Sequence, residues 1–197
     1  MATVLGVVLA AGRSTRFETG NKLLAEIGGE PVVVYAARTL FGSANGVDDA
    51  LAVLGHESGR IEDALADLNL RTVKNPDYGT GQATSVALGA RIAAEEGFDA
   101  ALFVLGDLPC VAPGTVRQLV ETFEQADAQI VVPTHDDKRG NPVLFGRQHF
   151  EELASLTGDR GGRAIFETHP VERVPVDDPG IHLDVDTVAD LQRVRDS

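Results

Sequence analysis

The feature that most constrains the fold is a pair of short apolar runs. Thr3–Leu9 reads TVLGVVL and Ala100–Leu105 reads AALFVL. A strand with one solvated face alternates apolar and polar residues, whereas a strand covered on both faces is apolar almost throughout. Amphipathic stretches with apolar residues at helical spacing separate such runs along the chain. This alternation predicts an α/β fold, with a mostly parallel sheet and helices on both of its faces.

The remaining elements follow from the same periodicities. We predict strands at Thr3–Leu9, Asp49–Leu54, Arg71–Lys74, Ala100–Leu105, Ile130–Pro133, Asn141–Phe145 and Glu172–Val176. We predict helices at Pro31–Phe41, Arg60–Leu68, Gln82–Ala94, Pro113–Ala126, Gln148–Leu156, Arg163–Thr168 and Thr187–Arg195. The chain has no internal repeat, no low-complexity segment and no linker long enough to separate domains. A single domain over residues 1–197 is therefore expected.

Composition excludes several classes of function. The net charge of −13 would repel nucleic-acid phosphates, so DNA and RNA are not expected partners. No apolar run approaches the roughly 18 residues of a membrane span, and the N-terminus lacks a signal-peptide pattern. The single cysteine, Cys110, excludes an internal disulfide, and we interpret it as a small packing residue. A reducing cytoplasm is the expected location.

The basic residues are unevenly divided, with three lysines among the 17 cationic side chains. Two interpretations fit this acidic, lysine-poor composition. One is an ordinary acidic cytosolic enzyme. The other, which we favour, is a halophilic protein whose surface carboxylates keep it soluble in concentrated salt.

The loop after the first strand, Leu9–Lys22, predicts a phosphate-binding site. It lies where a parallel sheet presents the carboxyl ends of its strands, and ligands of open α/β sheets bind there. Small residues let a phosphate approach the backbone N–H groups, and three cations come within ten residues. The residues expected to bind a nucleotide here are Leu9, Ala10, Ala11, Gly12, Arg13, Ser14 and Lys22, with Arg16 as a further cation. The alternative is a glycine turn with solvated basic residues. The loop is neither a Walker loop nor GxGxxG.

Acidic residues follow two later segments. Asp107 comes directly after the apolar run that ends at Leu105, and a carboxylate at that edge can hold Mg²⁺. Asp184 and Asp186 bracket Val185, so strand alternation would send both carboxylates to one face and complete a Mg²⁺ site. The alternatives are that Asp107 is an ordinary turn residue, and that one of the later aspartates caps the final helix.

Other segments are less decisive. The turn-rich loop Asn75–Gln82 leads into a helix that carries Ser85, and its backbone and hydroxyls offer uncharged contacts to a nucleotide base; otherwise it is a mere connection. Arg139, Arg160 and Arg163 could bind an anionic acceptor or lie in weak surface ion pairs. Four histidines show no metal-ligand spacing to one another: His56, His149, His169 and His182.

At this point the chain resembles a known family. Leu9–Lys22 is similar to the signature LAAGxSxRxG(x)nK of nucleotidyltransferases with a MobA-like fold, which attach CMP or GMP to molybdopterin or make CDP-methylerythritol. Leu105–Pro109 (LGDLP) resembles the LxGDxP motif of that family. Three further segments resemble the molybdenum-cofactor cytidylyltransferase branch: Arg139–Phe145 (RGNPVLF, against RGHPVLF), Gly158–Arg163 (GDRGGR, against GDxGAR) and Asp184–Leu191 (against DIDTPEDL).

The resemblance implies a function and a set of residue roles. The fold would be the Rossmann-like fold of nucleotide-diphospho-sugar transferases. The reaction would be a Mg²⁺-dependent transfer of a nucleoside monophosphate, CMP from CTP, onto a small phosphorylated acceptor, with molybdopterin first. Catalysis would rest on Arg16, Lys22 and Asp107, and the metal would bind Asp107 and Asp186, with Asp186 preferred over Asp184. Base and ribose contacts would come from Asn75, Gly81 and Ser85, and acceptor contacts from Asn141, Pro142, Arg160 and Arg163.

Alternatives remain open at this stage. The acceptor could be methylerythritol phosphate or another sugar or alcohol phosphate, the nucleotide could be GTP, or the chain could be a non-catalytic binding protein on a retained fold. Three residues depart from the family pattern. Phe17 replaces a methionine, Glu18 stands where glycine is common, and Asn141 replaces the histidine of RGHPVLF. Neither the oligomeric state nor a partner protein can be inferred.

Overall fold

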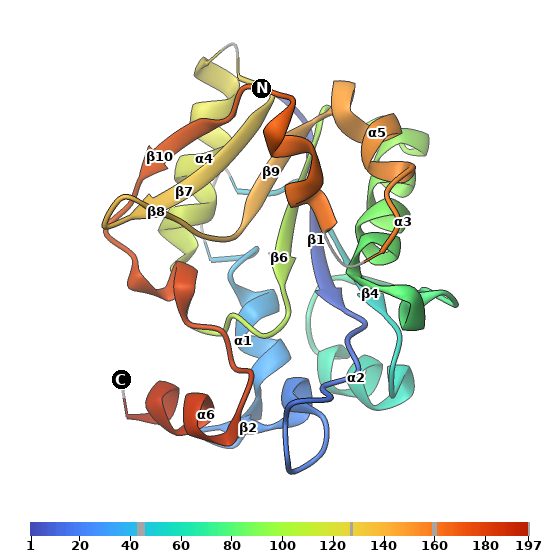
Figure 1. The fold of residues 1–197 in the computed structure, drawn as a ribbon, viewed down its shortest axis with the longest axis vertical. Helices are drawn as coiled ribbons and strands as arrows, with labels where there is room; N and C mark the ends of the chain where they lie inside the picture. Colours follow the sequence, from blue (N-terminus) through green and yellow to red (C-terminus); the bar gives the residue numbers. More distant parts are fainter. Residues whose placement is uncertain (43–45, 127, 159–160, 197) are drawn as a thin grey trace.

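The computed structural model describes residues 1–42, 46–126, 128–158 and 161–196. Its main feature is one mixed sheet with the strand order β10-β7-β9-β6-β1-β4-β5, in which the short strand β8 pairs with β7 (Figure 1). The strands are β1 (Val4–Ala10), β4 (Asp49–Leu54), β5 (Arg71–Lys74), β6 (Ala100–Leu105), β7 (Ile130–His135), β8 (Lys138–Arg139), β9 (Val143–Gly146) and β10 (Glu172–Pro175). The predicted fold class is confirmed.

The two apolar runs become the neighbouring central strands. Strand β1 pairs in parallel with both β4 and β6, so that Val7 lies between Leu51 and Phe103. Strands β4 and β5, and strands β7 and β10, also pair in parallel. Strand β9 is the exception, because it runs antiparallel to both β6 and β7. All the parallel strands therefore present their carboxyl ends at one edge of the sheet.

Helices cover both faces of the sheet, and each face has its own core. One core joins the sheet to α1 (Val32–Arg38), α2 (Ser58–Leu65) and α4 (Pro113–Gln125). The other joins it to α3 (Gln82–Glu95), α5 (Phe150–Ala154) and the 3-10 helix η4 (Gly161–Glu167). Because apolar side chains are buried on both sides, the central strands need apolar residues at consecutive positions.

The last helix, α6 (Val188–Arg195), packs elsewhere. Its Leu191 and Val194 form a third, small cluster with Phe17, Val32 and Val185. Cys110 packs against this cluster, as expected for a packing residue. Burial and the nearby Asp178 raise the pKa of the Cys110 thiol. The substitution of Phe17 for methionine thus keeps an apolar side chain in a buried place.

Several element boundaries differ from the prediction. The helix expected over Gln148–Leu156 is a 3-10 turn, η3 (Arg147–His149), followed by the short α5, and the helix expected over Arg163–Thr168 is the 3-10 helix η4. A small hairpin of β2 (Glu26–Ile27) and β3 (Glu30–Pro31) was not predicted, since each strand has only two residues. Further 3-10 turns are η1 (Lys22–Leu24), η2 (Tyr78–Thr80) and η5 (Pro179–His182).

The extended segment around Asp184 and Asp186 is not a strand, so that part of the prediction is wrong. The N–H of Val185 donates to the carbonyl of Asp107, at 2.9 Å, and not to a neighbouring strand. Thr187 is the N-cap of α6 and forms a capping box with Asp190, which frees Asp186 from a capping role. Within the described residues, no helix is long and apolar enough to cross a bilayer.

Candidate active site

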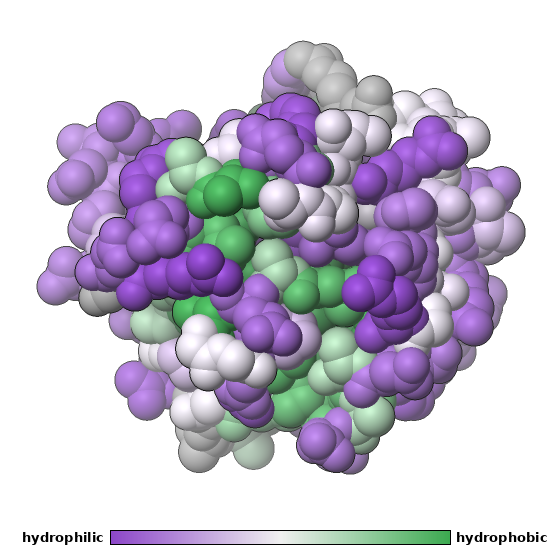
Figure 2. Space-filling view, turned by 90° about the horizontal axis from the view of Figure 1, so that it is seen from below, coloured by the Kyte–Doolittle hydropathy of each residue, from purple (hydrophilic) through white to green (hydrophobic). Residues whose placement is uncertain are grey.

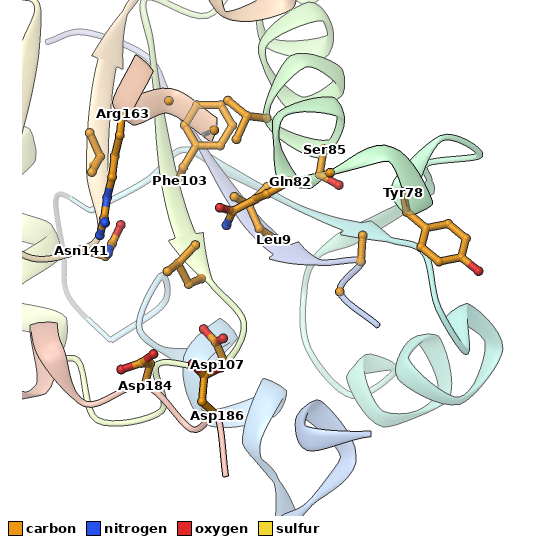
Figure 3. A pocket seen from close by; sticks show the side chains of 18 of the residues that line it. Leu9, Tyr78, Gln82, Ser85, Phe103, Asp107, Asn141, Arg163, Asp184 and Asp186 are labelled. Carbon is orange, nitrogen blue, oxygen red and sulfur yellow. The ribbon is translucent and has the colours of Figure 1, made fainter. Parts of the chain in front are cut away.

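A large pocket opens at the carboxyl edge of the sheet. Its volume is about 990 Å³, within the range of ligand sites. The side seen from below in Figure 2 shows hydrophobic surface near its centre with hydrophilic residues around it. The lining comes from strand ends and the loops that follow them, including Leu9, Phe103, Leu105 and Phe145 along the sheet. Figure 3 shows the carboxylates of Asp107, Asp184 and Asp186 at the bottom of this space, with Asn141 and Arg163 above Asp184 and Tyr78 on the opposite side of the view.

The first loop is organised by its own hydrogen bonds. Ser14 has a positive φ of 54°, which is uncommon for a residue with a side chain and is typical of functional loops. Its hydroxyl donates to Oδ1 of Asn21 and accepts the N–H of Lys22, at 3.0 and 3.1 Å. Asn21 in turn accepts the N–H of Leu23 as the cap of η1. These contacts fold residues 14–22 back on themselves and fix the position of Lys22.

Most residues predicted to bind the nucleotide from this loop line the pocket: Leu9, Ala11, Gly12, Arg13, Ser14 and Lys22. Ala10 is completely buried and is not part of the lining, so it acts through packing. A Cβ at Gly12 would meet nothing within 4 Å, which leaves open space beside the backbone. Glu18 is exposed and lies outside the pocket lining, so the negative charge at this position points away from the site.

The ammonium group of Lys22 lies between two carboxylates. Its Nζ is 2.5 Å from Oδ2 of Asp107 and 2.6 Å from Oδ1 of Asp186. Burial alone would lower the pKa of Lys22, but the charges and hydrogen bonds of the two aspartates outweigh burial and raise that pKa. Arg16 adds a second cation, with its NH1 2.7 Å from Oδ2 of Asp186. The basic loop and the two predicted metal carboxylates thus form one charged centre.

A buried apolar contact brings these charged groups together. Phe17, next to Arg16, is in the same cluster as Val185, next to Asp186. The backbone hydrogen bond from Val185 to Asp107 fixes the third member of the centre. Asp107 and Asp186 are 85 and 164 positions away from Lys22 in the sequence. Packing and the backbone hydrogen bond therefore hold the three residues together independently of their ion pairs.

The carboxylates fit a hard divalent cation. Among the described residues, Oδ1 of Asp107 is shielded from solvent and has no hydrogen-bond partner, which is costly for a carboxylate oxygen. Asp184 also lines the pocket, and partial burial together with the neighbouring Asp186 and Asp107 raises the pKa of its carboxyl. Carboxylate oxygens beside a phosphate site are the ligands that Mg²⁺ prefers.

The predicted base-binding loop divides into lining and supporting residues. Gly81 and Ser85 line the pocket, and Tyr78 and Gln82 join them (Figure 3). Asn75 does not line the pocket. It is buried, and its Nδ2 donates to Ser85 Oγ at 3.0 Å, so it positions Ser85. Gly81 has φ 122°, which a residue with a side chain would rarely adopt.

The opposite end of the pocket carries the predicted acceptor residues. Asn141 and Arg163 line it, whereas Pro142 is buried and does not. Arg160 lies outside the described residues. Arg139 also lines this end, with its guanidinium 4.6 Å from the centre of the Phe166 ring. Burial and then the charges of Arg163 and Arg173 lower the pKa of Arg139.

Sequence reasoning missed two groups of residues. The aromatic side chains Phe103, Phe145 and Phe166 form part of the pocket wall, although their strand or helix pattern only indicated a core position. The second group is His149, Glu152 and His169, which the structure brings together although the sequence spacing of the histidines indicates no ligand relation. Burial and the adjacent His169 lower the pKa of His149. The spacing His149-x-x-Glu152 was the available signal, since residues three apart share a helix face.

The fold and the site together define an α/β protein with a basic loop and convergent carboxylates at the carboxyl edge of its sheet. The model of the MobA-like NTP transferase domain matches residues 6–174, so the chain belongs to that family. A nucleotidyl transferase from Methanothermobacter thermautotroptrophicus has a TM-score of 0.83 and 25% identity, with 98% of this chain and 96% of that chain covered.

Another solved structure and a curated protein sequence are also similar to this chain. Rv0371c from Mycobacterium tuberculosis H37Rv, in complex with manganese, has a TM-score of 0.80 and 30% identity, with 99% of both chains covered. The bifunctional protein GlmU of Staphylococcus epidermidis is 29% identical over 142 residues, which is 72% of this chain. The chain spans 30% of the length of that curated relative.

Proposed function

We propose that the protein is a Mg²⁺-dependent nucleotidyltransferase that moves CMP from CTP onto a small phosphorylated acceptor, with molybdopterin as the leading candidate, and releases pyrophosphate. The observation that carries the proposal is the charged centre of Lys22, Asp107 and Asp186 beside the basic loop. Membership of the MobA-like NTP transferase family supports it. The shared fold of the Methanothermobacter nucleotidyl transferase supports it as well.

The metal would be held by Asp107 and Asp186. Both present oxygens at the centre, and Oδ1 of Asp107 lacks a partner among the described residues. When bound, the ion neutralises charge on the phosphate oxygens of the nucleotide. Asp184 lies in the same pocket as a third carboxylate, and burial first, then the charges of Asp186 and Asp107, raise the pKa of its carboxyl. The manganese of the Rv0371c complex is in keeping with a divalent ion in this family.

Arg13, Arg16 and Lys22 would hold the triphosphate. Arg16 is 75% exposed on its side chain, so it can move from Asp186 to a phosphate at little cost. The ammonium of Lys22 shares its carboxylate partners with the proposed metal, and a nucleotide with its metal would release it to the phosphate oxygens. Charge that develops on the leaving pyrophosphate is then met by cations already in place.

The uncharged rim at Gly81 and Ser85 would contact the base and ribose. The Leu9-Ala10-Ala11 form of the loop, by resemblance, favours CTP over GTP. The acceptor would bind at the far end, where Arg139 and Arg163 offer positive charge and Phe166 offers an aromatic face. A flat, phosphorylated acceptor such as a pterin phosphate matches that combination better than a plain sugar phosphate does.

A phosphate monoester acceptor also agrees with the kinds of residue in the pocket. Among the described lining residues there is no histidine that would serve as a strong general base. An acceptor phosphate is already ionised at neutral pH and needs no base to attack the α-phosphorus. The protein would contribute mainly positioning and charge neutralisation.

The test is pyrophosphate release with CTP and GTP, each against molybdopterin, methylerythritol phosphate and no acceptor, with and without Mg²⁺. We expect release with CTP and molybdopterin that depends on Mg²⁺. Release only with methylerythritol phosphate, or only with GTP, would replace the acceptor or the nucleotide in the proposal. Nucleotide binding without turnover on any acceptor would mean that the chain is a binding protein and not an enzyme.

A further inference from the structure

A second group of metal-ligand side chains lies outside the pocket, on the face of the sheet that α3 and α5 cover. His149 ends the turn η3, Glu152 is in α5, and His169 follows η4. Nε2 of His169 is 2.7 Å from Oε2 of Glu152, and Nδ1 of His149 is 3.9 Å from the same oxygen. The two imidazole rings meet edge to face, with centroids 4.5 Å apart. None of the three residues belongs to the pocket lining.

Three potential ligand atoms converge here, whereas a histidine–carboxylate hydrogen bond would require only two. One ligand atom from each of the three residues lies within 4.8 Å of the other two. Tetrahedral ligands at zinc distances lie about 3.4 Å from one another, since each is about 2.1 Å from the ion. The present separations of 2.7 and 3.9 Å from Oε2 of Glu152 bracket that value. Small side-chain rotations therefore suffice to admit an ion.

We propose that His149, Glu152 and His169 bind one transition-metal ion of the Zn²⁺ class through Nδ1, Oε2 and Nε2, with water in the fourth position. Two imidazole nitrogens and one carboxylate oxygen favour zinc over Mg²⁺, which prefers oxygen ligands alone. The side chain of His149 is 5% exposed, whereas those of Glu152 and His169 are 41% and 32% exposed. The site is thus anchored in the core and open to solvent on one side.

The neighbouring amide can orient His149 for metal binding once it is turned, because the amide nitrogen that now faces Nε2 is a donor and makes Nε2 the acceptor. The side-chain nitrogen of Gln148 is 3.3 Å from Nε2 of His149. Rotation of this amide by half a turn places its oxygen there, because amide oxygen and nitrogen exchange positions. The oxygen then accepts the N–H of Nε2 and leaves Nδ1 free to bind the metal. A metal-bound histidine usually donates its other N–H to such an acceptor.

The ion would connect α5 with the segment that follows η4. His169 follows η4, which contributes Arg163 and Phe166 to the acceptor end of the pocket. A metal that joins His169 to α5 therefore fixes the end of η4 against the body of the protein. The site is structural, and it is separate from the proposed Mg²⁺ carboxylates.

The experiment is a titration of the untagged chain with Zn²⁺ in competition with a chromophoric chelator, in millimolar Mg²⁺ to occupy the carboxylate centre. We expect one Zn²⁺ per chain, and a rise in melting temperature with Zn²⁺. His169→Ala and Glu152→Gln should each weaken binding at least about 100-fold, because even indirect partners of a ligand cost 10- to 100-fold. Both variants should keep the melting temperature of the metal-free wild type within a few degrees.

The matched control is His56→Ala. His56 is another partly exposed histidine, with Nε2 3.7 Å from Oε2 of Glu57. Among the described residues, however, the group of three potential ligand side chains is the one at His149, Glu152 and His169, and His56 has no place in it. Zinc affinity should be unchanged in this variant. Wild-type protein that binds no Zn²⁺, or His169→Ala protein that binds it as tightly as the wild type, would overturn the proposal. Neither result bears on pyrophosphate release, so the two proposals stand or fall separately.

Discussion

The two ends of the pocket handle charge differently. At one end the cations contact carboxylates of the chain itself, since Lys22 lies between Asp107 and Asp186 and Arg16 contacts Asp186. At the other end, burial and neighbouring arginines lower the pKa of Arg139, whose guanidinium rests on the ring of Phe166. Under the proposed function, the first end would exchange its internal partners for a metal and a triphosphate. The second end favours an anion that brings its own negative charge.

The largest effect is expected from the carboxylate that completes the first end. Asp107→Asn removes the negative charge of a proposed metal ligand and breaks the ion pair with Lys22, while the side-chain volume stays nearly constant. We expect Mg²⁺-dependent turnover to fall by about 1,000-fold or more, because charge stabilisation supplies most of such catalysis. Pyrophosphate release and the far-UV circular dichroism melting curve measure the two properties separately.

Asp184→Asn is the matched control for that experiment. Asp184 lines the same pocket and carries the same charge, but Lys22 pairs with the other two carboxylates. Turnover should fall much less in this variant. Equal loss in both variants would mean that Asp184 shares the metal, and an unaffected Asp107→Asn rate would remove Asp107 from the mechanism.

Lys22→Met tests separately the two proposed roles of Lys22, as the ion-pair partner of the carboxylates and as a ligand of the triphosphate. Without the ammonium, Asp107 loses its ion pair and Asp186 keeps only the exposed Arg16, so Mg²⁺ should bind the nucleotide-free protein about tenfold more tightly, about 1.4 kcal/mol. Turnover should nevertheless fall by about 100- to 1,000-fold, because the triphosphate loses a cation. Calorimetric titration with Mg²⁺ and steady-state kinetics give the two values. Weaker Mg²⁺ binding would contradict an exchange of partners at this end.

The acceptor end should respond through KM and not through the chemical step. Arg163→Ala is expected to raise the KM of the acceptor about 10- to 100-fold, the equivalent of one charged hydrogen bond of about 1.5–3 kcal/mol. The KM of CTP should change little. Arg117→Ala, which removes an exposed arginine of α4 outside the pocket, is the control. Equal changes in the KM of CTP and acceptor would place Arg163 near the nucleotide.

The sequence predicts the features that depend on neighbouring residues better than those that depend on residues far apart in the chain. Strands Asp49–Leu54 and Ala100–Leu105 have the predicted bounds, because their neighbours on both faces demand local apolar patterns. The edge strand Arg71–Lys74 also has the predicted bounds, although its residues are exposed or half-buried. The antiparallel direction of β9 follows from the path of the chain and leaves no local pattern. Lys22 and Asp107 were both predicted in the site, yet their direct contact was not, since no periodicity reports on residues 85 positions apart.

The aromatic wall and the histidine group illustrate the same limit. Phe103 lies in a strand in which every residue is apolar, so its exposure to the pocket depends on which elements fail to cover it. His149 and His169 are separated by the whole of α5 and η4. Only Glu152, one helical turn after His149, left a local trace.

Salt should change the KM values of the acceptor and of CTP less than the substitutions do. Mobile ions screen exposed charges over about 10 Å at 0.1 M and over shorter distances at higher concentration. Arg163 and Arg16 are both exposed, whereas only 14% of the Lys22 side chain is accessible. The KM of the acceptor should therefore rise a few-fold in KCl, and that of CTP should rise through Arg16 but keep the contribution of Lys22. The net charge of −13 acts in the opposite direction on stability, because screening relieves repulsion among surface carboxylates. If the chain is halophilic, molar KCl should raise its melting temperature by several degrees, at about 2–4 °C for each kcal/mol. Full stability and activity without added salt would instead favour an ordinary acidic enzyme.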